Sequence, residues 1–100
     1  MTYQLRRIAE KDLEEIWFHS CENWGIEQAD NYIRSLIVRF EWLSSNQQAG
    51  RKRNDIKTGY YCFPEGEHVV FYKIHRGLVD IIGIPHHSQD VVSHLSGGFD

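Results

Sequence analysis

Two runs of apolar residues, separated by a single glycine at position 25, are the feature that most constrains how this chain can fold. Within each run the apolar residues recur every three or four positions, which places them on one face of an α-helix. The first stripe comprises Leu13, Ile16, Trp17, Cys21 and Trp24, and the second comprises Ile26, Ala29, Ile33, Leu36, Ile37, Phe40 and Leu43. Gly25 suits the left-handed conformation that ends a helix, and a connection this short makes the two helices antiparallel. The sequence therefore predicts a helical hairpin over residues 9–45.

On either side of this hairpin the apolar residues alternate with a period of two, and β-branched and aromatic residues are frequent, as is typical of strands. The predicted strands cover residues 3–8, 56–63, 68–75 and 78–84. Residues 64–67 and 76–77 are rich in turn formers and would connect the last three strands as hairpins. The order predicts an α+β fold, in which an N-terminal strand and an antiparallel helical hairpin precede a three-strand antiparallel meander. The hairpin should pack on one face of the sheet.

The remaining segments are polar. Residues 44–50 have the composition of a loop, which leads into a basic cluster. Residues 88–95 can form one short helix, and the glycine-rich residues 96–100 are expected to be a frayed tail. Since no repeat or linker interrupts the pattern, residues 1–95 are expected to form a single domain.

The composition fits one small folded domain and argues against several functional classes. At 100 residues and 11.8 kDa there is room for one core, and 41% hydrophobic residues suffice to form it. No stretch approaches the roughly 18 apolar residues of a membrane span, and the N-terminus lacks the apolar core of a secretory signal. We therefore expect a cytoplasmic protein without membrane contact, with Cys21 and Cys62 as buried thiols. A net charge of −3 gives no reason to expect direct nucleic-acid binding by the chain alone.

Six histidines in 100 residues raise the question of metal binding or acid–base catalysis. On a helix, His86, Asp90 and His94 would share one face at i, i+4 and i+8, and such a set can bind Zn²⁺ or Fe²⁺. Alternatively, His86 or His87 could act as a general base that Asp90 orients. The segment is short, follows Pro85, and has no nucleophile motif or phosphate loop beside it. We therefore expect no metal, no cofactor and no catalytic residue, and hence a protein that is not an enzyme.

Positive charge is concentrated in one segment, Arg51-Lys52-Arg53-Asn54-Asp55-Ile56-Lys57. This segment is either a solvated loop or a site for an anionic partner. Tyr60 and Tyr61 follow it closely, and aromatic side chains beside basic ones can stack on nucleic-acid bases, although packing in the core is the simpler interpretation.

A set of short motifs, taken together and in order, points to a known family. The motifs are Ala9 with Asp12-Leu13, Trp24-Gly25 with Gln28-Ala29 and Tyr32, Leu36 with Phe40 and Leu43, Gly50-Arg51, Gly59-Tyr60 with Phe63, Gly66 with His68-Val69-Val70-Phe71-Tyr72, and His86 with Asp90 and His94-Leu95. In this order and spacing they resemble the RelE/ParE superfamily of bacterial toxins, and within it the ParE branch. The resemblance spans nearly the whole chain and implies the same order of strand, helical hairpin and sheet.

The ParE branch implies a toxin of a type II toxin–antitoxin module, which inhibits DNA gyrase and is neutralised by a cognate ParD-like antitoxin. The RelE branch implies a ribosome-dependent mRNA endonuclease instead. Members of the superfamily commonly carry arginines where this chain has Tyr61 and Gly83. Without those cations, RNA cleavage would lose groups that stabilise the phosphate in the transition state, so endonuclease activity is disfavoured. A third alternative is an attenuated toxin that retains only antitoxin binding, because these two positions, and Pro85 where leucine is usual, bear on target binding as well.

Within this resemblance, two sets of residues are expected to contact partners. The set expected to bind the target comprises Arg51, Lys52, Arg53, Tyr60, Tyr61, His86 and Asp90. The set expected to bind the antitoxin, on the apolar side of the hairpin, comprises Leu13, Trp17, Leu36 and Phe40. An antitoxin segment is expected to lay a helix over the second set and to add a strand to the edge of the sheet.

Overall fold

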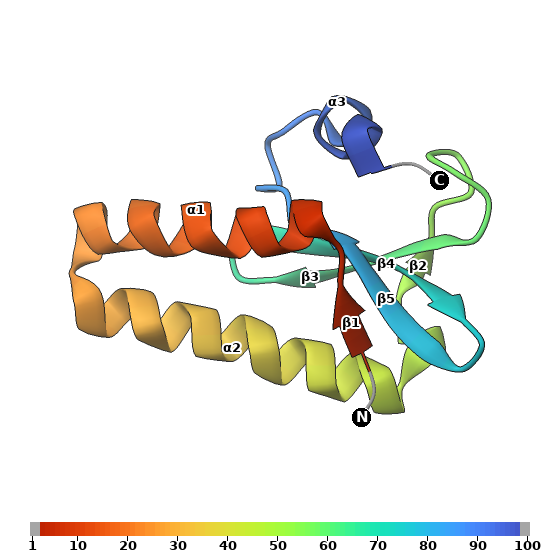
Figure 1. Ribbon diagram of the computed structural model, residues 1–100, viewed down its shortest axis with the longest axis horizontal. Helices are drawn as coiled ribbons and strands as arrows, with labels where there is room; N and C mark the ends of the chain where they lie inside the picture. The colour runs from red at the N-terminus through yellow and green to blue at the C-terminus, as the bar shows by residue number, and fades with distance from the viewer. Residues whose placement is uncertain (1–2, 99–100) are drawn as a thin grey trace.

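The computed structural model describes residues 3–98, in which a helical hairpin lies along one face of a sheet (Figure 1). After β1 (Tyr3–Leu5), helix α1 (Arg7–Trp24) runs to the hairpin turn and α2 (Ile26–Ser45) runs back. Gly25 joins the two helices with a φ of 94°, a left-handed conformation that a side chain would disfavour. Its N–H donates to the carbonyl of Cys21 at 2.9 Å. The antiparallel helical hairpin predicted from the sequence is confirmed.

The N-terminal strand is shorter than predicted, because α1 begins before its apolar stripe does. The strand was expected to include Ile8 but ends at Leu5. Arg6 is the turning point: its N–H donates to the carbonyl of Ile81 at 2.9 Å, while its own carbonyl accepts from the N–H of Glu10 at 3.0 Å. The chain thus passes from the sheet into the helix within one residue.

Within residues 3–98 the sheet has five strands in the order β1-β5-β4-β3-β2, and the predicted antiparallel meander forms its centre. The meander and the second edge strand are β2 (Arg51–Lys52), β3 (Tyr60–Glu65), β4 (His68–His75) and β5 (Leu78–Gly83). The other edge is β1, which pairs in parallel with β5.

Two boundaries in this region differ from the prediction. β2 lies in a segment expected to be a loop, and it pairs antiparallel with β3. β3 begins at Tyr60 instead of residue 56, because residues 54–59 form a turn. A hydrogen bond from the N–H of Gly59 to Oδ1 of Asn54, at 2.8 Å, closes that turn.

Both faces of the sheet are covered, whereas the sequence predicted a cover on one face. The core under α1 and α2 includes Leu36, Phe40, Leu43, Val70, Tyr72, Val79 and Ile81. A smaller cluster on the second face is made of Tyr60, Cys62, Phe71, Ile82 and Leu95. An irregularity in the pairing of β4 with β5 places Ile82 as an extra residue between the partners of Tyr72 and Phe71. Ile81 and Ile82, which are successive residues of β5, are buried in the clusters on opposite faces, as the alternation of a strand places them.

The C-terminal segment provides this second cover. The predicted helix over residues 88–95 is limited to α3 (Val91–Leu95), because residues 86–89 form a turn after β5. Residues 96–98 form a 3-10 turn in place of the frayed tail expected there, and Phe99 and Asp100 lie outside the described residues. Leu95 is fully buried and anchors α3 to the sheet.

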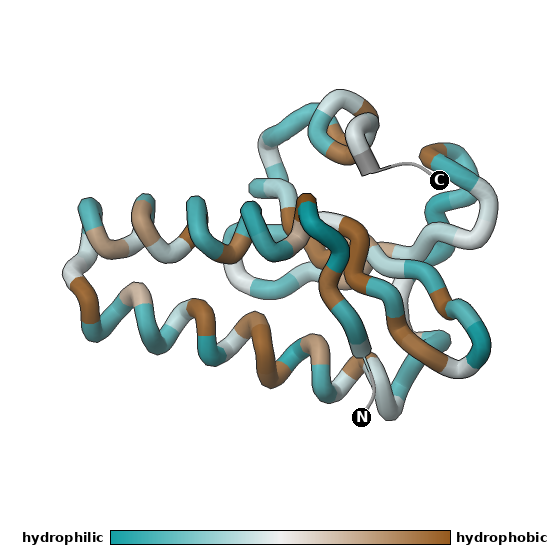
Figure 2. Tube along the Cα trace, viewed as in Figure 1, coloured by the Kyte–Doolittle hydropathy of each residue, from teal (hydrophilic) through white to brown (hydrophobic). Residues whose placement is uncertain are grey.

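The closed end of the hairpin projects beyond the sheet (Figure 1). Trp24 and Ile26 are consequently 74% and 62% exposed, although both belong to the predicted apolar stripes. Figure 2 shows hydrophobic residues recurring along both helices, and in α2 they continue to the closed end of the hairpin. Within residues 3–98, neither helix is long and apolar enough to cross a membrane. Both cysteines are free; Cys62 is buried as predicted, and Cys21 is partly exposed.

Candidate functional site

A groove of about 400 Å³ on the second face of the sheet brings together three of the predicted target-binding residues. Arg51 comes from β2, Arg53 follows that strand, and His86 comes from the segment after β5. The remaining lining is mainly apolar and comprises Ala49, Cys62, Phe63, Pro64, Val69, Phe71, Pro85, His87 and Val91. An apolar lining with cationic groups at its side suits a partner that offers an apolar contact next to an acidic one.

Arg51, Lys52 and Arg53 differ in their contacts and in their exposure. The Arg53 guanidinium donates from Nε and Nη2 to the carboxylate of Asp55, both at 3.0 Å, and lies 5.6 Å from the ring centroid of Phe71. This hydrogen bond raises the pKa of Arg53 and lowers the pKa of the Asp55 carboxyl. Arg51 and Lys52 are exposed, and the alternation of a strand directs them to opposite faces. Arg51 is therefore the exposed cation of the groove, whereas Arg53 belongs to its wall.

The structure separates the other predicted target-binding residues from this groove. Tyr60 is 1% exposed, in the cluster on the second face. Tyr61 lies on the hairpin face, where its ring stacks on Tyr72 with centroids 5.3 Å apart and its hydroxyl donates to Oε1 of Gln48 at 3.1 Å. Asp90 precedes α3 and lines a different hollow. The two tyrosines therefore do not form a stacking surface together, and core packing, the simpler interpretation, agrees with their positions.

The predicted single helix face of His86, Asp90 and His94 is also absent, since α3 begins only at residue 91. His94 instead bonds to Asp12, and Nδ1 of His86 lies 2.8 Å from Oγ of Ser88. Asp90 therefore does not orient His86 as a general base would require.

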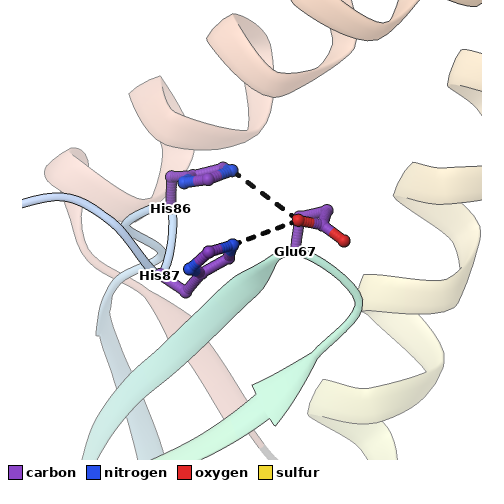
Figure 3. A group of neighbouring side chains, drawn as sticks. All are labelled: Glu67, His86 and His87. Carbon is purple, nitrogen blue, oxygen red and sulfur yellow. Dashed lines mark hydrogen bonds and ion pairs between the residues drawn. The ribbon is translucent and has the colours of Figure 1, made fainter.

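A different histidine cluster lies beside the groove (Figure 3). Glu67, in the turn between β3 and β4, faces His86 and His87 from the segment after β5. Its Oε1 is 3.1 Å from Nε2 of His87 and 3.9 Å from Nε2 of His86. The backbone fixes these two segments together, because the N–H of His87 donates to the carbonyl of Glu67 at 3.0 Å. Sequence spacing could not reveal this cluster, since the pairing of distant segments creates it.

Tyr32 anchors the same β3–β4 turn to α2. Its hydroxyl lies 2.7 Å from Nδ1 of His68 and accepts a hydrogen bond from the N–H of Glu67 at 2.9 Å. Burial, with a further contribution from His86, lowers the pKa of His68 to about 4, so this imidazole is neutral near neutral pH. Gly66 leaves room for the phenol ring, because a Cβ there would stand 2.6 Å from its Oη.

Of the four residues expected to bind an antitoxin, two are buried in the core and two are partly exposed. Leu36 and Phe40 are fully buried beneath the hairpin, so a helix laid over the outside cannot reach them, and this part of the prediction needs correction. Leu13 and Trp17 are partly exposed, and Nε1 of Trp17 donates to Oδ1 of Asp30 at 2.8 Å. The stripe pattern finds core residues and partner-facing residues alike, which is why the sequence could not separate them.

Val38 and Trp42, on the outer side of α2, are exposed apolar residues close in sequence to the buried Leu36 and Phe40. Their side chains are 57% and 40% exposed, and they line a shallow hollow of about 580 Å³ together with Asn31, Arg34, Ser35, Arg39 and Glu65. The Arg39 guanidinium lies 4.9 Å from the ring of Trp42 and 4.9 Å from that of Phe63, and it donates to Glu65 at 2.8 Å. The hollow therefore combines apolar and basic groups held in a fixed arrangement.

Comparison with known proteins shows which family this chain matches and which proteins it is similar to. Residues 3–91 match the family described as "ParE toxin of type II toxin-antitoxin system, parDE". The chain is 37% identical over 94 residues to a protein of Caulobacter vibrioides named Toxin ParE1, with 93% of this chain and 96% of that protein covered. It is 33% identical, with the same coverage, to a Mycobacterium tuberculosis protein of the same name.

A solved structure supports the fold independently. The structure titled "Chromosomal ParDE TA system from P. aeruginosa" superposes with a TM-score of 0.74, at 21% sequence identity, covering 86% of this chain and 95% of that one. At that identity the likeness concerns the fold, namely the strand, the helical hairpin and the antiparallel meander.

Proposed function

Because the chain belongs to the ParE toxin family of type II toxin–antitoxin systems, we propose that it inhibits DNA gyrase and is neutralised by a ParD-like antitoxin. The observation that supports this most directly is the match to two proteins named Toxin ParE1 over nearly the whole of each chain. The protein would act in the cytoplasm, by binding its target and not by catalysis.

The outer side of α2 is the surface best suited to the antitoxin. Val38 and Trp42 offer apolar contacts, and Arg34 and Arg39 lie beside them in the same hollow. An acidic amphipathic helix would match both features, since its apolar face can cover the first pair and its carboxylates can meet the arginines. This placement replaces the buried Leu36 and Phe40 with exposed residues of the same helix.

The groove on the second face is the surface proposed for the target. Arg51 is exposed there beside an apolar lining, and His86 lies in the same groove. The groove lies on the second face of the sheet, whereas α2 belongs to the hairpin that covers the first face. The two partners would therefore use different surfaces, which adjoin at Phe63 of the groove lining, 4.9 Å from the Arg39 guanidinium.

The endonuclease alternative finds little support in the geometry. Tyr61 lies on the hairpin face, away from the groove, and a side chain at position 83 would meet Leu95 of α3. Neither position can therefore present a cation to a phosphate in the groove without a rearrangement of α3 or of the sheet.

Induction of the chain in cells without its antitoxin, combined with a gyrase supercoiling assay on purified proteins, tests this proposal. Growth arrest and loss of supercoiling, both reversed by the antitoxin encoded beside it, would support it. Antitoxin binding without growth arrest would identify an attenuated toxin, and ribosome-dependent mRNA cleavage with normal supercoiling would favour the endonuclease. Either result would overturn gyrase inhibition.

A further inference from the structure

The side chains of Glu67, His86 and His87 have the composition of a transition-metal site (Figure 3). Neither of the two partner surfaces proposed above involves metal binding. One ligand atom from each residue can be chosen so that all three lie within 4.8 Å of one another. In a tetrahedral zinc site, ligand atoms about 2.0–2.1 Å from the ion stand about 3.4 Å apart. Small rotations of exposed side chains are enough to reach that spacing, because Glu67 and His87 are 72% and 59% exposed.

The two imidazoles are already held with suitable atoms facing the carboxylate. Nδ1 of His86 lies 2.8 Å from Oγ of Ser88 and accepts from the N–H of Ser88 at 3.2 Å. Because Nδ1 accepts, the neutral ring carries its proton on Nε2, which faces Glu67. When an ion binds, Nε2 gives up this proton and Nδ1 takes one up, which the hydroxyl of Ser88 can then accept, as the partner of a metal-bound histidine does. Nε2 of His87 also faces Glu67, at 3.1 Å.

The backbone positions these side chains without help from an ion. His68 and His86 form an isolated antiparallel bridge, and the N–H of Val69 donates to the carbonyl of Pro85 at 3.0 Å. The three ligands thus come from two segments that are far apart in the sequence but fixed together in the fold. The backbone of the site is therefore fixed before an ion binds, and only the exposed side chains of Glu67 and His87 have to be ordered.

We propose that Glu67, His86 and His87 bind one divalent transition-metal ion of the class that includes Zn²⁺. Two nitrogen donors and one carboxylate suit this class of ion, and three protein ligands leave one position for water. The ion fastens the segment after β5, including the groove residue His86, to the β3–β4 turn. Folding does not depend on the ion, because the core forms around other residues.

Titration of Zn²⁺ into the full chain, freed of any polyhistidine tag and treated with chelator, tests the proposal by calorimetry. We expect one ion per chain and a rise in Tm of at least about 5 °C at saturating zinc. Glu67→Gln and His87→Ala should each weaken binding at least about tenfold, and Ser88→Ala should weaken it less. Because the two ligand side chains are mostly exposed, these variants should melt like the wild type without zinc.

Matched controls separate this site from adventitious binding. His75→Ala removes an exposed histidine at the end of β4, outside the cluster, and Cys21→Ser removes the more exposed thiol. Both should bind zinc as the wild type does. The proposal is overturned if the ligand variants keep wild-type affinity, if His75→Ala loses as much, or if no saturable binding of one ion is found.

Discussion

The carboxylate of Asp12, on α1, joins His94 of α3 to the end of β5. Its Oδ2 accepts a hydrogen bond from the N–H of Ile84 at 2.7 Å, and Nε2 of His94 lies 2.9 Å from each carboxylate oxygen. Asp12 is 5% exposed; its contact with Ile84 is buried and its contact with His94 is partly buried. One buried side chain thus connects the helical hairpin, the sheet and the C-terminal segment.

Removal of this carboxylate should destabilise the protein. In Asp12→Ala the N–H of Ile84 would be buried without its acceptor and His94 would lose its partner, which should lower the free energy of unfolding by about 1–3 kcal/mol. Urea denaturation measures the change. Asp90→Ala, which removes an exposed carboxylate just before α3, is the matched control and should change stability by no more than about 0.5 kcal/mol. Equal stability of the two variants would contradict this account of Asp12.

Gly83 and Leu95 should be coupled, because the leucine side chain occupies the space a Cβ at position 83 would need. Gly83→Ala should therefore cost about 1–3 kcal/mol through overpacking. In Gly83→Ala/Leu95→Ala the two losses should not add, since the second change relieves the first. A double-mutant cycle of unfolding free energies measures this coupling.

Gly97→Ala provides the control for that cycle. A Cβ at Gly97 would find its nearest neighbour, Cδ1 of Ile8, at the ordinary contact distance of 3.8 Å. This variant should be close to neutral. Additive losses from Gly83→Ala and Leu95→Ala would show that α3 does not rest on the glycine.

The outer side of α2 can be tested by placing a negative charge on it. Val38→Glu should weaken antitoxin binding at least about tenfold, because it removes an apolar contact and repels an acidic helix. Calorimetric titration of the toxin with the purified antitoxin measures the affinity. Phe18→Glu is the matched control: Phe18 is 61% exposed but lies on α1, outside the hollow. If Phe18→Glu alone weakens binding, the antitoxin surface lies on α1.

Much of the fold could be predicted because helix and strand periods are local properties. The stripes on either side of Gly25 gave the hairpin, and alternation gave the meander. β2 was missed because a two-residue edge strand at Arg51–Lys52 has no period of its own and exists only through its pairing with β3. The cover on the second face did leave a signal: Leu78–Gly83 is apolar at nearly every position, as in strands buried on both sides.

The candidate site was less predictable, because long-range pairing builds it. Arg51 and His86 reach one groove through β2 and the segment after β5, and nothing in their spacing indicates that. Tyr60 and Tyr61 are neighbours in sequence, yet the strand sends them to opposite faces. Composition could identify residues capable of binding, but only the sheet register decides which of them meet.

Arg51 and Lys52 form the sharpest test of the groove, since they are adjacent, exposed and equally charged but face opposite sides of β2. Arg51→Ala should raise the toxin concentration needed for half-inhibition of gyrase at least about tenfold, as expected when a hydrogen bond to a charged group is lost. Lys52→Ala should inhibit like the wild type, and both variants should keep wild-type stability within about 0.5 kcal/mol. Arg53→Ala should lower stability instead, because it breaks the pair with Asp55 and the contact with Phe71. Equal loss of inhibition in the first two variants would mean that overall charge, and not the groove, recognises the target.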